Sequence, residues 1–166
     1  MQYLCLESYD SNKGSIDFSC LRNLKFLELD LASDFVYGVE ELPELISLVQ
    51  NNAVVDIERL LPLRKKLRYL NLNNSTVLNI EMLAEFRNLE VLYIQNIRNV
   101  AFRNPNNLSF IRKLRKLKVL SVQHNTINSL SMLNRHRHLE KLYIGHTNIK
   151  DIPPSLSNND RLEIFR

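Results

Sequence analysis

The chain has 166 residues, of which 45% are hydrophobic and 24% are charged, a balance typical of one folded globular domain. No stretch approaches the length of about 18 uninterrupted apolar residues that a membrane-spanning helix needs, so no membrane association is expected. Only 3 glycines are present, which argues against a glycine-rich phosphate-binding loop.

The net charge of +4 conceals an uneven distribution along the chain. Residues 1–60 contain 11 acidic and 4 basic side chains, whereas residues 61–166 contain 7 acidic and 18 basic ones. Such a division between two parts of a chain favours an anionic partner for the basic part.

The two cysteines, Cys5 and Cys20, form neither a C-x-x-C pair nor a disulfide framework. The first residues, MQYLCLESYD, lack the basic and apolar segments of a secretory signal. Together these features predict a reducing intracellular location, in the cytoplasm or the nucleus.

Apolar residues recur at a nearly constant interval from one end of the chain to the other. The intervals between the first apolar residues of successive expected strands are 23, 21, 22, 22, 28, 22 and 23 residues. A period of this length is typical of a solenoid, in which each unit packs on its neighbours. Eight units fill residues 1–166, so one domain is predicted. The reference residues are Leu4, Leu27, Leu48, Leu70, Leu92, Leu120, Leu142 and Phe165.

Three segments show the repeat most clearly. Leu67–Ile80 reads LRYLNLNNSTVLNI, Leu117–Leu130 reads LKVLSVQHNTINSL, and Leu139–Ile152 reads LEKLYIGHTNIKDI. Their pattern, L-x-x-L-x-L-x-x-N-x-L-x-x-L, resembles the leucine-rich repeat family in its short class of about 22 residues, which includes the bacterial internalins. The resemblance implies an α/β solenoid with a parallel β-sheet on its concave face and 3₁₀ turns or short helices on its convex side.

Two units depart from the pattern. In the unit at about residues 42–63, Gln50 stands where the second strand leucine should be, which predicts a slipped register or a frayed strand. The segment VEELPELISLV, which begins at Val39, is alternatively expected to form a helix. The fifth unit is longer than the others, and we expect its extra residues, about 99–107, to form a protruding loop around Asn104-Pro105-Asn106.

Side chains that alternate with the inward leucines are expected to form ladders on the concave face. These ladders are rich in tyrosine and amide side chains and almost uncharged at their centre, which suits recognition of a protein surface. The alternative is a purely structural role, because a solvated sheet carries polar residues and cross-strand tyrosine pairs stabilise sheets without a ligand. The predicted partner-binding residues are Tyr69, Asn71, Asn73, Tyr93, Gln95, Ser121, Gln123 and Tyr143.

Basic side chains recur in the turns that enter the strands, two residues before the first leucine of the motif. Stacking at the repeat spacing places these like charges close together, which is unfavourable unless water, salt or an anion relieves it. The partner would be RNA, a ribonucleoprotein particle such as a ribosome, or an acidic protein; the alternative is a solvated rim. The predicted basic edge comprises Arg64, Lys65, Lys66, Arg87, Arg112, Lys113, Arg115, Lys116, Lys118 and Arg137.

His124 and His146 occupy equivalent positions 22 residues apart and should therefore be neighbours on adjacent strands. Such a pair can bind a metal or respond to pH, but no cysteine or acidic residue in the same register completes a ligand set. We interpret the pair as solvent-facing histidines and expect no metal and no cofactor.

No catalytic motif is recognisable, whether G-x-S-x-G, a P-loop, H-E-x-x-H or paired metal-binding cysteines. The resemblance implies a curved, non-enzymatic interaction module without a small-molecule substrate. The sequence thus predicts a module that binds a protein through its concave face, and the alternative is an accessory subunit of a ribonucleoprotein particle, docked through the basic edge.

Overall fold

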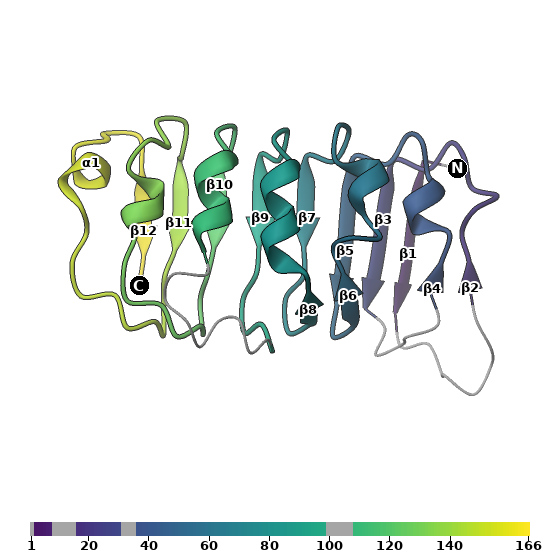
Figure 1. Ribbon diagram of the computed structural model, residues 1–166, viewed down its shortest axis with the longest axis horizontal. Helices are drawn as coiled ribbons and strands as arrows, with labels where there is room; N and C mark the ends of the chain where they lie inside the picture. Colours follow the sequence, from purple (N-terminus) through teal and green to yellow (C-terminus); the bar gives the residue numbers. More distant parts are fainter. Residues whose placement is uncertain (1, 8–15, 31–35, 99–107) are drawn as a thin grey trace.

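The computed structural model describes residues 2–7, 16–30, 36–98 and 108–166. Within these residues, eight parallel strands form one sheet in which the spatial order follows the sequence order, as the repeat predicted (Figure 1). Each unit therefore pairs with the units before and after it. The strands are β1 (Tyr3–Glu7), β3 (Phe26–Asp30), β5 (Ser47–Asn51), β7 (Tyr69–Asn71), β9 (Val91–Tyr93), β10 (Val119–Ser121), β11 (Lys141–Tyr143) and β12 (Glu163–Phe165).

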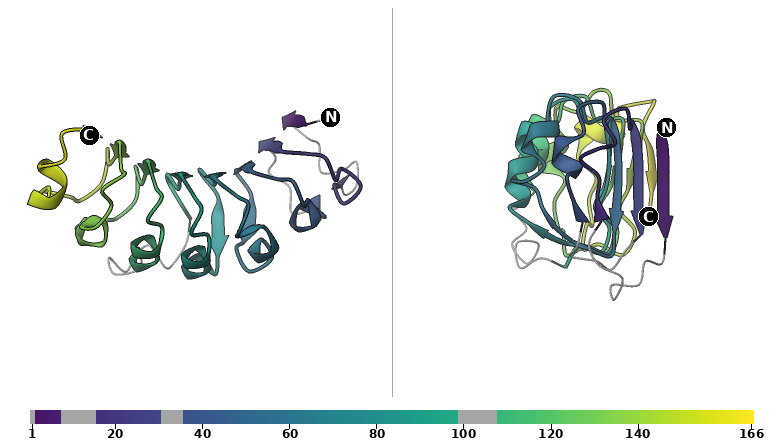
Figure 2. Two further views of the ribbon diagram at one scale, coloured as in Figure 1. Left: turned by 90° about the horizontal axis from the view of Figure 1, so that it is seen from above. Right: turned by 90° about the vertical axis from the view of Figure 1, so that its right-hand side faces the viewer.

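The sheet lines the inner side of a curved solenoid, and the helical segments lie on its outer side (Figure 2). These segments are short because a unit of about 22 residues leaves few residues for the convex side. In the described part of the chain, no helix is long and apolar enough to span a membrane. The segments are the 3₁₀ helices η2 (Val39–Glu41), η3 (Leu61–Leu63), η4 (Ile80–Glu85), η6 (Ser109–Lys113) and η7 (Ser131–Leu133), and the helix α1 (Pro154–Ser157).

Two short ladders add pairing outside the concave sheet. Strand β2 (Ile16–Asp17) pairs with β4 (Val36–Tyr37), and β6 (Val54–Asp56) pairs with β8 (Thr76–Leu78). Both pairs are parallel and join neighbouring units, so they repeat the connectivity of the main sheet.

One continuous hydrophobic core runs along the solenoid between the sheet and the convex segments. In the central units both inward strand residues are fully buried, as Leu70 with Leu72 and Leu92 with Ile94 show. Burial of one such side chain stabilises the fold by about 2 kcal/mol relative to exposure. Because these side chains also pack on the adjacent units, no unit buries its apolar side chains without its neighbours.

The turns that follow β5, β7, β9, β10 and β11 use a left-handed backbone conformation. Asn52, Asn74, Asn96, His124 and His146 occupy this turn in five successive units, with φ values from 47° to 58°. Asparagine and histidine adopt this conformation more readily than most residues that carry a Cβ atom. The requirement of the turn therefore accounts for the polar residue that follows each of these strands.

The expectations for the unit around Gln50 were wrong. Strand β5 is complete, and Gln50 pairs in register with Leu29 of β3, without slippage or fraying. The Gln50 side chain is only 9% exposed, so it fills the inward position that a leucine takes in other units. The segment that begins at Val39 contains only the three-residue helix η2 before β5 starts.

The reference residue of the last unit was also wrong by one position. Ile164, and not Phe165, pairs with Leu142 of β11. Phe165 is 38% exposed and pairs with Tyr143 on the concave face, where the two rings stack. The loop expected at about residues 99–107 lies outside the described residues.

Candidate binding surface on the concave sheet

Four aromatic rings form a continuous row across the C-terminal half of the concave face. The ring centroids of Tyr69 and Tyr93 are 5.9 Å apart, those of Tyr93 and Tyr143 are 6.5 Å apart, and those of Tyr143 and Phe165 are 4.5 Å apart. Tilted and stacked pairs at these separations are favourable arrangements of aromatic quadrupoles. The sequence predicted the three tyrosines as concave residues but missed Phe165.

Ser121 lies beneath this row. Its strand, β10, separates β9 from β11, so Tyr93 and Tyr143 start roughly 10 Å apart at the backbone. Their centroids are only 6.5 Å apart, so the rings lean toward each other, and Ser121 between them is completely buried. Its hydroxyl oxygen accepts a hydrogen bond of 2.8 Å from Nε2 of Gln95. The structure therefore gives Ser121 a supporting position below the predicted contact surface.

Amide side chains border the aromatic row where the strands end. Oδ1 of Asn73 accepts a hydrogen bond of 2.9 Å from the backbone N–H of Gln95, and Oδ1 of Asn71 accepts one of 3.1 Å from the N–H of Asn73. The Asn71, Asn73, Gln95 and Gln123 side chains are all half-buried. These bonds hold the Asn71 and Asn73 amides in place before any partner arrives, which lowers the entropy cost of binding.

The environment of the tyrosines favours their neutral form. Burial raises the pKa of Tyr69 and of Tyr93 above the ordinary value of a phenol. The rings therefore present hydroxyl groups that donate and accept hydrogen bonds at neutral pH. An apolar ring with such a polar tip suits contact with a protein surface.

The opposite end of the concave face is acidic. Glu28 accepts a hydrogen bond of 3.0 Å from the Tyr3 hydroxyl, and this bond raises the pKa of Tyr3 to about 12. Asp30 accepts a bond of 2.6 Å from Nδ2 of Asn52. Glu7 pairs with Asp30 in the ladder of β1 and β3. The surface thus changes from acidic at β1 and β3 to rich in aromatic and amide side chains at β7 to β12, where Lys141 and Glu163 are the charged members of the strands and lie side by side.

The predicted basic edge is exposed throughout, but part of its charge is neutralised. Lys66 forms an ion pair of 3.0 Å with Glu44, and Lys118 forms one of 2.7 Å with Glu90. Lys116 donates a bond of 2.7 Å to the Asn88 amide oxygen. Within the described residues, no ion pair joins the other predicted members of the edge to an acid. They are Arg64, Lys65, Arg87, Arg112, Lys113, Arg115, Lys116 and Arg137.

Sequence reasoning missed an alternation of charge within this edge. Glu90 accepts bonds from Arg68, at 2.6 Å, and from Lys118, at 2.7 Å, which come from the units before and after it. These bonds lower the pKa of Glu90. All three residues stand two positions before a strand leucine, so the register alone contained the signal. Such exposed pairs stabilise the fold little, but they remove basic charge from the surface.

His124 and His146 are neighbours, as their spacing predicted. Their rings stack with centroids 4.3 Å apart and planes 15° apart, and both side chains are exposed. Among the described residues, no group of three or more histidine, cysteine, aspartate or glutamate side chains is arranged to hold a metal ion.

Several solved structures of leucine-rich repeat proteins resemble this one. An internalin from Listeria monocytogenes has a TM-score of 0.66 and 22% identity, and the match covers 98% of this chain and 79% of that one. A leucine-rich repeat protein from Leptospira interrogans has a TM-score of 0.68 and 22% identity, covering 89% and 38%. The ectodomain of a membrane receptor kinase from Arabidopsis thaliana, in complex with CASPARIAN STRIP INTEGRITY FACTOR 2, has a TM-score of 0.64 and 17% identity, covering 92% and 19%.

By sequence alone, no family model and no curated protein matches the chain. The structural likeness extends over nearly all of it, and the parallel concave sheet and the 3₁₀ segments agree with the resemblance that the repeats indicated. The chain therefore has the leucine-rich repeat fold.

Proposed function

We propose that this chain is a non-enzymatic module that binds a protein partner through the concave face, centred on the aromatic row. The observation that carries the proposal is the continuity of Tyr69, Tyr93, Tyr143 and Phe165 across β7 to β12. Solvent reaches all four rings, and hydrogen-bonded amides border them. Tyrosine is enriched among the residues that dominate binding energy in protein interfaces.

The chemistry of the face defines the partner. A surface of tyrosine and amide groups fits apolar or aromatic side chains together with exposed backbone donors and acceptors. The acidic end, at Glu7, Glu28 and Asp30, would favour basic side chains at the corresponding end of the partner. The plant receptor ectodomain, which has the same fold, was determined in complex with another molecule, which is consistent with this use of the fold.

The proposal is tested by capture from lysate of the cells that produce the protein. The immobilised chain is compared with a Tyr93→Ala/Tyr143→Ala variant and with Tyr37→Ala as a matched control. Tyr37 is 45% exposed, but it lies on β4, outside the concave sheet. We expect the same captured proteins with the unmodified chain and the control, and their loss with the double variant. Equal capture by all three proteins would contradict the proposal.

The basic edge supports a second candidate, an accessory subunit of a ribonucleoprotein particle. Eight of its ten predicted residues form no ion pair in the described structure, and this is the observation in favour. The neutralised Lys66 and Lys118 weaken it, as does the acidic end at β1 and β3. Treatment of the same lysate with RNase separates the two candidates. Capture that RNase abolishes and that the double tyrosine variant retains would replace the first candidate with the second.

A further inference from the structure

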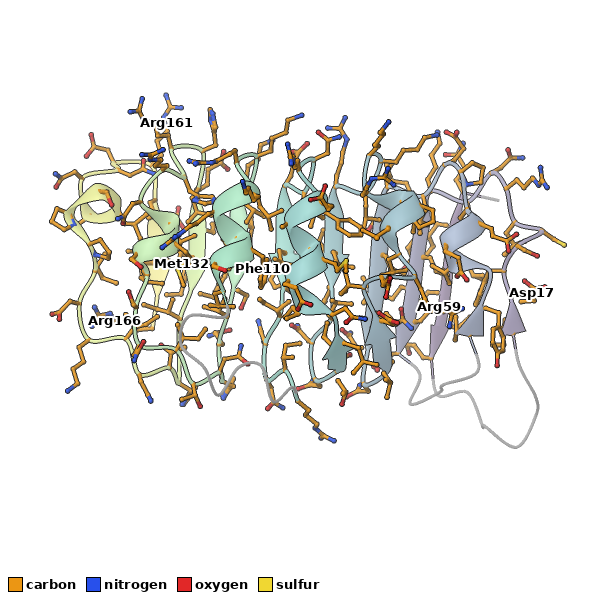
Figure 3. The ribbon with its side chains drawn as sticks, in the orientation of Figure 1. Asp17, Arg59, Phe110, Met132, Arg161 and Arg166 are labelled. Atoms are coloured by element: carbon orange, nitrogen blue, oxygen red, sulfur yellow. The ribbon has the colours of Figure 1, made fainter. Side chains whose placement is uncertain are left out.

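A hollow of about 360 Å³ lies on the convex side, between η6 and η7. Three arginines line it: Arg112 in η6, Arg115 in the turn that follows, and Arg135 after η7. Ser131, Met132 and Asn134 complete the lining. Figure 3 shows Met132 beside the turn that carries Phe110, on the outer side of the solenoid and thus away from the aromatic row.

The electrostatic environment of the hollow is strongly positive. None of its lining residues is acidic, and none of its three arginines forms an ion pair within the described residues. From residue 108 to residue 166, all of which the structure describes, the chain has 11 basic and 4 acidic side chains, a net charge of +7. Like charges that line one hollow repel each other unless water, salt or an anion relieves the repulsion, and a bound anion would do so directly.

One of the three arginines is held to the next unit by a hydrogen bond. Nη1 of Arg115 donates a hydrogen bond of 3.3 Å to the backbone oxygen of Arg135, which links two successive units at the hollow. This bond uses one of the five N–H groups of the guanidinium and leaves the others for a ligand. Planar guanidinium groups bind tetrahedral phosphate oxygens in paired hydrogen bonds, which lysine cannot do.

A second hollow, of about 230 Å³, continues from the first and shares Asn134 with it. Its lining includes Arg137, Ser155 and Asn158, whose side chains suit the donors and acceptors of an extended peptide backbone. Among the described residues, no tyrosine, phenylalanine or tryptophan lines either hollow, and His136, which lines the second one, is only 3% exposed and offers an unpaired base little surface for stacking. These features favour a peptide over a single-stranded nucleic acid.

We propose that the hollow between η6 and η7 binds the phosphate group of a phosphorylated serine or threonine in a partner protein, and that the adjoining hollow holds the peptide that follows. The phosphate brings nearly two negative charges and three acceptor oxygens to three otherwise unpaired arginines. The site is on the convex side, so it is independent of the concave face and of the function proposed for it.

The probes are a pool of random short peptides with a fixed central phosphoserine, the same pool with serine, inorganic phosphate, and a 20-base-pair RNA duplex of mixed sequence. Each is titrated into the full ¹⁵N-labelled chain at constant ionic strength, and the arginine Nε–Hε resonances are followed. The test variant is Arg112→Gln/Arg135→Gln. The matched control is Lys65→Gln/Arg87→Gln, which removes the same charge from exposed residues of the same edge.

We expect the phosphoserine pool to bind more tightly than the serine pool and than inorganic phosphate, and to shift the resonances of Arg112, Arg115 and Arg135. The test variant should lose about 100-fold in affinity, because each lost charge-assisted contact corresponds to roughly tenfold. The control should change affinity by less than about threefold, because its charges lie in earlier units and are screened.

Three results would overturn the proposal: equal binding of the phosphoserine and serine pools, inorganic phosphate as strong as the phosphoserine pool, or equal losses in the test variant and the control. Tighter binding of the RNA duplex than of the phosphoserine pool, with the same loss in the test variant, would assign the hollow to nucleic acid instead. A negative result in this test does not affect the function proposed for the aromatic row, because the two experiments use different variants and different binding partners.

Discussion

Asn125 gives the sharpest test of how the units hold one another, because its buried side chain joins two of them. Its Nδ2 donates hydrogen bonds of 2.7 Å to the Ile94 oxygen and 3.0 Å to the Val122 oxygen, and its Oδ1 accepts one of 3.1 Å from the Ile97 N–H. Only 5% of Asn125 is exposed, so water cannot replace these bonds when the amide is removed.

Each of the three bonds contributes about 1 kcal/mol, so Asn125→Ala should lower the free energy of unfolding by about 3 kcal/mol. In a chain of this length, that loss lowers the melting temperature by roughly 6–12 °C. Asn125→Thr should cost about 2 kcal/mol. The natural Thr147 at the equivalent place keeps one such bond, of 2.7 Å, to the Ile144 oxygen.

The assay is urea unfolding followed by circular dichroism, with the exposed Asn128→Ala as the control in the same segment. The control should stay within about 0.5 kcal/mol of the unmodified chain. If Asn125→Ala costs no more than this control, bonds between units contribute nothing measurable, and the reasoning about this position fails.

Two further predictions concern burial and backbone conformation. Burial lowers the pKa of His136, whose Nε2 donates to the Ile111 oxygen at 2.9 Å, so the folded state binds a proton less readily than the unfolded state. The free energy of unfolding should therefore fall as the pH drops below about 6.5. Urea unfolding at pH 7 and pH 5 should show a smaller fall for His136→Leu than for the unmodified chain. An unchanged pH dependence in this variant would contradict the role given to His136. Gly38 has a φ of 74°, and a Cβ there would lie 2.5 Å from the Ser19 nitrogen. Gly38→Ala should thus cost about 2 kcal/mol or more, and an unaltered melting temperature would refute this.

Sequence periodicity was sufficient to predict the solenoid, its parallel sheet and the concave ladders, because strand alternation and repeat spacing decide which residues face inward. Periodicity gave wrong predictions at single positions where side-chain packing decides which residue faces inward. Ile164 is the inward residue while Phe165 stacks on Tyr143, and a pattern of apolar letters does not distinguish the two. At Gln50, a complete ladder with β3 outweighed the unfavourable side chain.

The sequence predicted most of the residues on the candidate surfaces, but it did not predict how their side chains are arranged. The spacing placed Tyr93 and Tyr143 on one face, but the ring orientations that cover Ser121 depend on side-chain torsions. Counting basic residues alone overstated the free charge of the edge, because Lys66 pairs with Glu44 and Lys118 pairs with Glu90. Arg135, which completes the convex hollow, was not among the predicted residues, although it lies one repeat interval after Lys113, which was.

The most direct test of the proposed function is the dissociation constant of the isolated partner for the unmodified chain, Tyr93→Ala/Tyr143→Ala and Tyr37→Ala. Removal of a central tyrosine from a protein interface typically costs about 2 kcal/mol, so the double variant should bind on the order of 100-fold or more weakly, while Tyr37→Ala should bind normally. Circular dichroism confirms that each variant is folded. Equal dissociation constants for the three folded proteins would contradict binding through the concave aromatic row.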